Sequence, residues 1–267
     1  MSQEELEETK NALAPTLDYS EQVVCITGGS RGIGRAITKA FDELGAICAI
    51  VYRSDEKSAN DLLSELSNPN HKLFKADVSV PDQAAQLIKD VLEAFAGIDV
   101  FVNNAGIGAH HPIDQTSYED WQQHFQKIMG INFFAGANLC HQVSQHMTTK
   151  KSGCIINVTS RGAFRGEPLQ PAYGASKAAM NSLTQSLAFA LAPHNIFVGA
   201  VAPGFVETDM AKERLEGPRG DGIRSQSPMN RVAKPEEVAQ AVVLMASSPI
   251  WMTGSIFDVN GASYFRI

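Results

Sequence analysis

The sequence predicts an α/β fold in a single domain: a doubly wound, parallel sheet of seven strands with helices on both faces. Short apolar runs that suit buried strands alternate with helical stretches along the chain, an order that indicates a parallel sheet covered on both sides. The first apolar run leads directly into a glycine-rich turn and then a helix. With 267 residues, 44% of them hydrophobic, the chain can form one large core, and no linker or repeat divides it.

The N-terminal segment differs from the rest of the chain. Four of its first eight residues are glutamates, and it lacks the basic start and apolar run of a signal peptide. We expect residues 1–20 to form a flexible extension and residues 21–267 to form the domain, in a cytoplasmic protein. The four scattered cysteines fit small buried hydrophobic residues in a reducing compartment; they are Cys25, Cys48, Cys140 and Cys154.

Charge and composition exclude several classes of partner. A formal net charge of -7 argues against nucleic acid or an anionic membrane as the main partner. No apolar run approaches the roughly eighteen residues that suggest a membrane span. His110 and His111 form a pair without further ligands, which favours a solvated loop over a metal site. We therefore expect no nucleic acid, no membrane and no metal.

The first predicted strand and the turn after it indicate a dinucleotide site. Gln22 to Thr27 is a buried-strand pattern, Gly28 to Gly34 follows it, and a helical segment runs from there to Leu44. Glycines allow the backbone to turn tightly and approach a pyrophosphate, whose charge is favoured by the helix N-terminus. This order predicts a Rossmann fold, with an ordinary glycine-rich structural turn as the alternative.

The next predicted strand, Ala46 to Val51, bears on the choice of cofactor. Tyr52 stands where such a fold presents the acid that binds a ribose 2′-hydroxyl, and no acid is present there. Arg53 offers planar donors for a 2′-phosphate, Arg31 could approach it from the glycine loop, and Ser54 adds a hydroxyl. The pattern predicts NADP(H) over NAD(H); solvated surface arginines are the alternative.

A tyrosine and a lysine carry the predicted chemistry. Tyr173 and Lys177 are four residues apart, so a helix presents them on one face, and Ser160 lies thirteen residues upstream of the tyrosine. A phenol near a cation is a suitable general acid or base for a carbonyl or an alcohol. Taken alone, the pair also fits an ordinary amphipathic helix.

Several motifs occur together in one order, and with them the chain resembles the short-chain dehydrogenase/reductase family in its compact single-domain form. The likeness covers about Gln22 to Val259 and is nearest to the 3-oxoacyl-acyl-carrier-protein reductase branch. The motifs are the glycine loop with Thr27 before it, Asp77-Val78, Asn103-Asn104-Ala105-Gly106, Asn132, Ser160, the Tyr173/Lys177 pair and Pro203-Gly204.

The resemblance implies a catalytic tetrad. Tyr173 is the general acid in reduction, and Lys177 lowers the pKa of the tyrosine and binds the ribose hydroxyls. Ser160 donates a hydrogen bond to the substrate carbonyl oxygen, and Asn132 places a water that links Lys177 to solvent. Thr159 competes with Ser160, but the thirteen-residue spacing favours Ser160.

The resemblance also implies the residues that bind the cofactor. Asp77 and Val78 contact the adenine, small residues after the fourth strand let the backbone approach, and the Pro203 to Thr208 backbone faces the carboxamide. The full set is Gly28, Ser30, Arg31, Gly32, Ile33, Gly34, Arg53, Ser54, Asp77, Val78, Asn104, Ala105, Gly106, Tyr173, Lys177, Pro203, Gly204, Val206 and Thr208.

We therefore expect an NADPH-dependent enzyme that reduces a ketone to a secondary alcohol, as 3-oxoacyl-thioester reductases do. Phe189 stands where that branch has a basic patch for its carrier protein, so a reductase of a small ketone, sugar, polyol or secondary metabolite is the alternative. A non-catalytic NADP(H)-binding sensor or scaffold is a third hypothesis. Residues near 207–230 suit a substrate lid. Members of the family form homodimers or homotetramers through the helices that correspond to Tyr118 to Thr148 and Pro171 to Leu191, and the resemblance implies the same assembly here.

Overall fold

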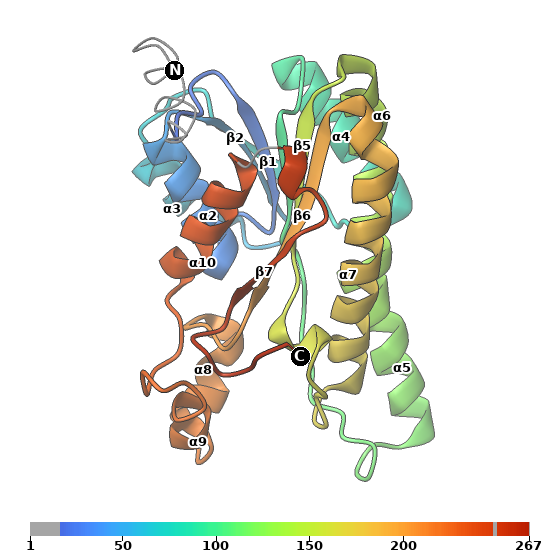
Figure 1. Cartoon of the computed structure of the whole chain (residues 1–267), viewed down its shortest axis with the longest axis vertical. Helices are drawn as coiled ribbons and strands as arrows, with labels where there is room; N and C mark the ends of the chain where they lie inside the picture. Colours follow the sequence, from blue (N-terminus) through green and yellow to red (C-terminus); the bar gives the residue numbers. More distant parts are fainter. Residues whose placement is uncertain (1–16, 248–249, 267) are drawn as a thin grey trace, which may run out of the picture.

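The computed structural model describes residues 17–247 and 250–266, and within them seven parallel strands form one sheet (Figure 1). The order across the sheet is β3-β2-β1-β4-β5-β6-β7. The strand bounds are β1 Val23–Thr27, β2 Ile47–Tyr52, β3 Lys72–Lys75, β4 Val100–Asn103, β5 Gly153–Val158, β6 Ile196–Pro203 and β7 Ile256–Val259. The predicted seven-stranded parallel sheet is thus confirmed.

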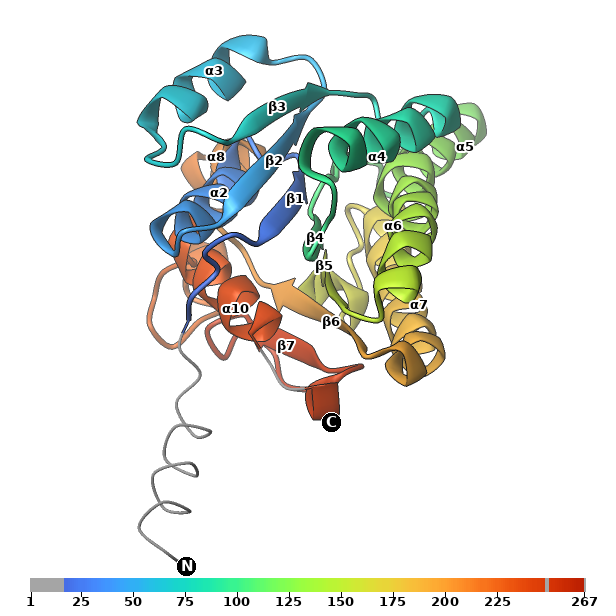
Figure 2. The same ribbon diagram turned by 90° about the horizontal axis from the view of Figure 1, so that it is seen from above.

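Helices cover both faces of this sheet (Figure 2). One face carries α2 (Gly32–Glu43), α3 (Glu56–Glu65) and α10 (Pro235–Ala246), and the other carries α4 (Pro81–Phe95), α6 (Gly136–Lys150) and α7 (Pro171–Leu191). All five residues of β1 are buried, as expected for a strand with a helical layer on each side. The two apolar layers fix the carboxyl ends of the strands along one edge, where the site lies.

The order of the central strands explains where that site forms. β1 pairs with β2 on one side and with β4 on the other. The strand order therefore reverses at β1: β2 and β3 are added on one side of it, and β4 to β7 on the other. Loops that leave two such neighbouring strands diverge to opposite faces and leave a crevice between them. The loops after β1 and β4 are the glycine loop and the Asn103–Gly106 motif.

The long helix expected over Tyr118 to Thr148 is interrupted. α5 spans Tyr118–Met129, one π-helical turn spans Gly130–Ala135, and α6 follows. Asn132 lies in the π-helical turn, where its amide donates to the Ile107 carbonyl at 2.9 Å and accepts from the Ile107 amide at 2.8 Å. A π-helical turn widens the helix locally and is frequent at functional sites. This one directs Asn132 toward the loop after β4.

Two short helices lie beyond β6 at the edge where the strands end. α8 spans Asp209–Glu216 and α9 spans Gly220–Arg224, and Figure 1 shows both apart from the layer of α2 and α10. The two helices pack together through a small apolar cluster of Ala211, Leu215, Ile223 and Val232. The segment expected as a lid is therefore helical and has a small core of its own.

Part of the expected N-terminal extension packs on the domain. Residues 1–16 lie outside the described residues, but Tyr19 is buried and its hydroxyl donates to the Val243 carbonyl at 2.8 Å. Its ring meets Phe41 edge-on, with 4.9 Å between centroids. Among the described residues, no helix is long and apolar enough to cross a membrane.

The four cysteines are buried, as expected for small hydrophobic residues. Burial raises the pKa of Cys25 and of Cys140 to about 12, so both thiols are protonated at neutral pH.

Candidate active site

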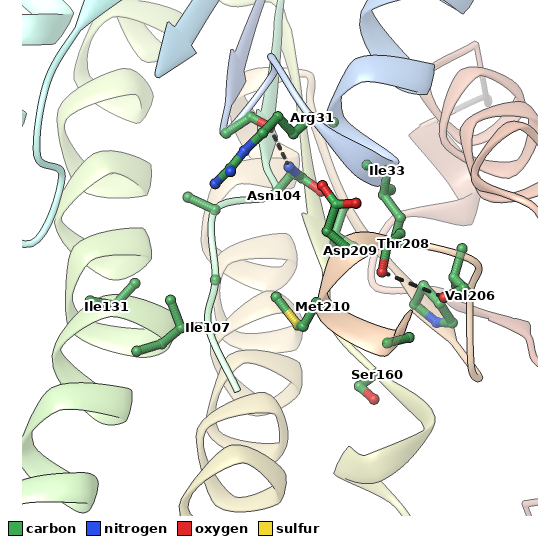
Figure 3. A pocket seen from close by; sticks show the side chains of 18 of the residues that line it. Arg31, Ile33, Asn104, Ile107, Ile131, Ser160, Val206, Thr208, Asp209 and Met210 are labelled. Carbon is green, nitrogen blue, oxygen red and sulfur yellow. Dashed lines mark hydrogen bonds between the residues drawn. The ribbon is translucent and has the colours of Figure 1, made fainter. Parts of the chain in front are cut away.

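A cavity of about 580 Å³ lies at the carboxyl ends of the strands, a volume typical of ligand sites. Its walls come from the glycine loop, from the ends of β2, β4, β5 and β6, and from the first turns of α7 and α8 (Figure 3). Every residue expected to bind the cofactor lines this one cavity, and so do Ser160, Tyr173 and Lys177. Asn132, the fourth member of the expected catalytic tetrad, does not line the cavity.

The glycine loop is shaped for close approach by a ligand backbone. Gly28 and Gly32 have φ of +63° and +51°, which side-chain-bearing residues rarely adopt. A Cβ on Gly34 would lie 2.1 Å from the Gly28 carbonyl oxygen, so this position requires glycine. Arg31 precedes α2 without a side-chain cap, which leaves the first amides of the helix available to an anion. The loop therefore fits the pyrophosphate of a dinucleotide.

Asn104 braces this loop from the neighbouring strand. Its amide donates to the carbonyls of Thr27 and Gly28 at 2.9 and 3.2 Å. The Thr27 hydroxyl in turn accepts from the backbone amides of Asn104 and Ala105 at 2.9 and 3.0 Å. These bonds join the loops after β1 and β4 into one rigid floor of the cavity.

Arg31, Arg53 and Asp55 line the end of the cavity near β2. The sequence analysis named both arginines but did not identify Asp55. Arg31 forms an ion pair with Asp55 at 3.3 Å, and the Asp55 carboxylate also accepts from the Ser58 amide at the start of α3. Among the described residues, Arg53 has no carboxylate within 4.0 Å. Arg31 is thus partly neutralised by its ion pair, whereas Arg53 forms no ion pair with a described residue and only helps to lower the pKa of Asp77.

Ser160, Tyr173 and Lys177, which were expected to be catalytic, line the same cavity, and the part that they line is here called its reacting end. Ser160 follows β5, and its hydroxyl accepts from the Gly162 amide at 3.0 Å. The neighbouring Thr159 hydroxyl donates to the Val201 carbonyl at 3.0 Å and is engaged in the sheet, so the geometry favours Ser160 as the free hydroxyl. Tyr173 lies in the first turn of α7, and the Lys177 ammonium lies 5.8 Å from the centre of its ring.

Burial dominates the electrostatics of this pair. It raises the pKa of Tyr173, against the smaller opposite effect of the Ser160 hydroxyl. It lowers the pKa of Lys177 from 10.5 to about 8. Lys177, which the resemblance implied would lower the pKa of Tyr173, is not among the groups that shift it here, and its ammonium donates to the Val158 carbonyl at 2.9 Å. The phenol is therefore a protonated acid at neutral pH.

Asn132 acts on this centre from outside the cavity. Besides its two bonds to Ile107, its amide donates to the Ser176 hydroxyl at 3.1 Å. A Cβ on Gly106 would lie 3.4 Å from both the Asn132 amide oxygen and the Lys177 ammonium, so these two groups flank the same glycine. Asn132 thus fixes the loop that separates it from Lys177.

His111 is buried, which corrects the expectation of a solvated loop. Its ring is 1% exposed and stacks on His124 with 4.8 Å between centroids. Nε2 accepts from the Ala172 amide at 3.1 Å, and Nδ1 bonds the Ala109 carbonyl at 2.9 Å. Desolvation lowers the pKa of His111, so the ring is neutral. His111 therefore caps the start of the helix that carries Tyr173.

Further residues from several elements line the cavity. Ile107 and Ile131 approach from the loop after β4 and from the π-helical turn, and Met210 enters from α8 (Figure 3). Polar groups here are Arg161, Glu167, Gln170 and Arg214. Of these, Arg214 lies in the segment 207–230 that the sequence analysis expected as a lid. Among the described residues, no group of three or more His, Cys, Asp or Glu is arranged to bind a metal.

Comparisons with known proteins give the following likenesses. A sequence model described as short chain dehydrogenase matches residues 22–219. A 3-oxoacyl-[acyl-carrier-protein] reductase of Synechocystis sp. is 37% identical over 245 residues, covering 90% of this chain and 96% of that protein. A 3alpha-hydroxysteroid dehydrogenase of Mediterraneibacter gnavus is 36% identical over 248 residues, covering 91% and 96%. The solved structure of ElxO with NADP bound has a TM-score of 0.81 at 29% identity and covers 91% of this chain and 98% of that one.

Proposed function

The chain belongs to the short-chain dehydrogenase family of oxidoreductases, and from this we propose that it reduces a ketone to a secondary alcohol with NADPH. The observation that carries the proposal is the single cavity that has the glycine loop at one end and Ser160, Tyr173 and Lys177 at the other. The glycine loop would hold the pyrophosphate of a nicotinamide dinucleotide at one end, and the Ser160 and Tyr173 hydroxyls would hold a carbonyl at the other.

In the proposed reaction the bound cofactor supplies the hydride that reduces the carbonyl carbon. The Tyr173 phenol donates its proton to the carbonyl oxygen as negative charge develops there. The Ser160 hydroxyl donates a hydrogen bond to the same oxygen and stabilises that charge. With a pKa of about 8, the Lys177 ammonium can return a proton to the tyrosine near neutral pH. Asn132 keeps the loop beside Lys177 in place.

The preference for NADP(H) is supported by the wall near β2. Arg53 lines the cavity without a carboxylate partner among the described residues, and the buried Tyr52 occupies the position of the usual ribose-binding acid. A guanidinium binds phosphate through paired hydrogen bonds, whereas it gains little from a hydroxyl. The NADP bound to the related ElxO structure is consistent with this choice.

Two substrate classes are candidates. A 3-oxoacyl thioester is supported by the names of the curated relatives. A smaller free ketone is supported by Phe189, which is 89% exposed on α7 and offers no charge to an acidic carrier protein. The exposed apolar residues of the α5–α7 region, such as Tyr118 and Phe189, also support a homodimer or homotetramer.

The test is NADPH oxidation against a panel of carbonyl compounds that includes acetoacetyl thioesters, free ketones and sugars, with NADH in parallel. The proposal predicts oxidation of one NADPH for each alcohol formed, and faster turnover with NADPH than with NADH. Turnover of the thioester alone would select the first substrate class, and turnover of free ketones alone would select the second. No oxidation with any carbonyl compound would overturn the proposal.

A further inference from the structure

Arg161 is a buried cation with unused hydrogen-bonding capacity. The side chain is 4% exposed, and its Nε has no partner among the described residues. One terminal nitrogen donates to the Ser263 hydroxyl at 2.7 Å, and the guanidinium lies 5.5 Å from the centre of the Phe205 ring. Burying a guanidinium with an unpaired donor costs free energy unless a ligand completes its bonding. Arg161 lines both the main cavity and a smaller neighbouring one of about 140 Å³.

A second guanidinium enters the same cavity from α8. Arg214 donates to the side-chain oxygen of Gln170 at 2.8 Å, and this partner is neutral. Its charge influences the pKa of Tyr173, so it lies within electrostatic reach of the reacting end. Among the described residues, neither Arg161 nor Arg214 has a carboxylate within the 4.0 Å of an ion pair.

The charges facing these arginines are unbalanced. Glu167 lines the same cavity, and its carboxyl interacts electrostatically with Arg161, Arg165 and Arg214. Burial raises the pKa of Glu167, which favours its neutral form and leaves the guanidiniums less compensated. The other cavity carboxylates lie elsewhere: Asp55 and Asp77 are at the end near β2 and β3, and Asp209 is near Thr208 at the start of α8 (Figure 3).

We propose that the substrate carries a carboxylate, bound by Arg161 and Arg214, beside the ketone that Tyr173 and Ser160 address. The inference rests on the proposed ketone reduction and narrows its substrate to oxo acids. An ionised carboxylate accepts paired hydrogen bonds from a guanidinium, so it would engage the free donors of both arginines and neutralise the excess charge. A neutral ester of the same shape would leave those donors unpaired.

The experiment compares kcat/KM for a series of oxo acids, with one to four carbons between ketone and carboxylate, against their methyl esters. For at least one chain length we expect a preference of tenfold or more for the acid. Arg214→Met keeps the side-chain length and removes the charge, and it should reduce the acid-to-ester ratio at least tenfold. Arg161→Met should reduce the acid-to-ester ratio to the same extent. If this variant of a buried residue does not fold, Arg214→Met, at a partly exposed position, still tests the inference. Arg219→Met, in the same segment but outside the cavity, should leave the ratio unchanged.

Equal or faster turnover of every ester, or an unchanged ratio in Arg214→Met, would overturn the inference while leaving ketone reduction intact. A second measurement does not depend on turnover: calorimetry gives the affinity of the oxo acids and of their esters for the enzyme saturated with NADP⁺. The oxidised cofactor cannot reduce these compounds, so only binding is measured. Tighter binding of an acid than of its ester, reduced by Arg214→Met, supports the carboxylate site even if no carbonyl compound is reduced. Absence of that difference overturns it.

Discussion

Replacing Lys177 by methionine, which is similar in length and uncharged, measures what the buried ammonium costs the fold. Burial lowers the pKa of Lys177 from 10.5 to about 8, so below pH 8 the side chain is charged both folded and unfolded. In that range the folded state bears the full desolvation cost, about 3 kcal/mol. The cost fades as the pH rises from 8 toward 10.5, and at pH 10 it is below about 1 kcal/mol.

The methionine variant also loses the donor to the Val158 carbonyl, which costs about 1–3 kcal/mol and does not depend on pH. The difference between two pH values therefore isolates the charge. Urea unfolding of variant and wild type, without cofactor, should show that Lys177→Met is more favourable at pH 7 than at pH 10 by about 2–3 kcal/mol. The exposed Lys89→Met serves as control and should show no such pH dependence. A stability difference equal at both pH values would refute the reasoning.

Two further predictions concern the cofactor and the helix that carries Tyr173. Arg53→Asp should weaken NADPH binding at least tenfold more than NADH binding in fluorescence titrations, and equal losses would contradict the 2′-phosphate site. His111→Ala should cost about 1–2 kcal/mol through the lost cap on Ala172 and lower kcat more than it changes KM, whereas His111→Gln keeps an acceptor and should recover much of both. The pKa of His111 is lowered from 6.5, so the unfolded state binds a proton more readily than the folded state, and the stability of the wild type should fall as the pH drops below 6.5. His111→Ala should lose this part of the pH dependence, and a variant with the pH dependence of the wild type would contradict the role of His111.

The sheet and the glycine loop could be predicted because their determinants are local. The apolar run over Val23–Thr27, the positive-φ glycines and the helix after them are consecutive in the chain. The spacing of Tyr173 and Lys177 likewise needs only a helix to bring both side chains to one face. The residues expected to bind the cofactor came from motifs at the ends of the strands, which a parallel sheet brings to one edge, and all of them line the same cavity.

The features that the sequence did not reveal depend on contacts between distant residues. The π-helical turn is tied to bonds that Asn132 makes to Ile107 and to Ser176, 25 and 44 residues away. The burial of His111 depends on Ala172, 61 residues later. The buried position of Arg161 depends in the same way on Ser263, 102 residues later, which accepts a hydrogen bond from its guanidinium. No periodicity or spacing encodes such pairs.

The central claim is that Tyr173 is the proton donor in a cofactor-bound ketone reduction. It is tested most directly by Tyr173→Phe, which removes the hydroxyl and keeps the ring. The account predicts that NADPH affinity stays within about twofold of wild type while kcat on the best ketone falls by roughly 10²- to 10⁴-fold, the usual contribution of a general acid. A variant that retains wild-type kcat would contradict the assignment of Tyr173.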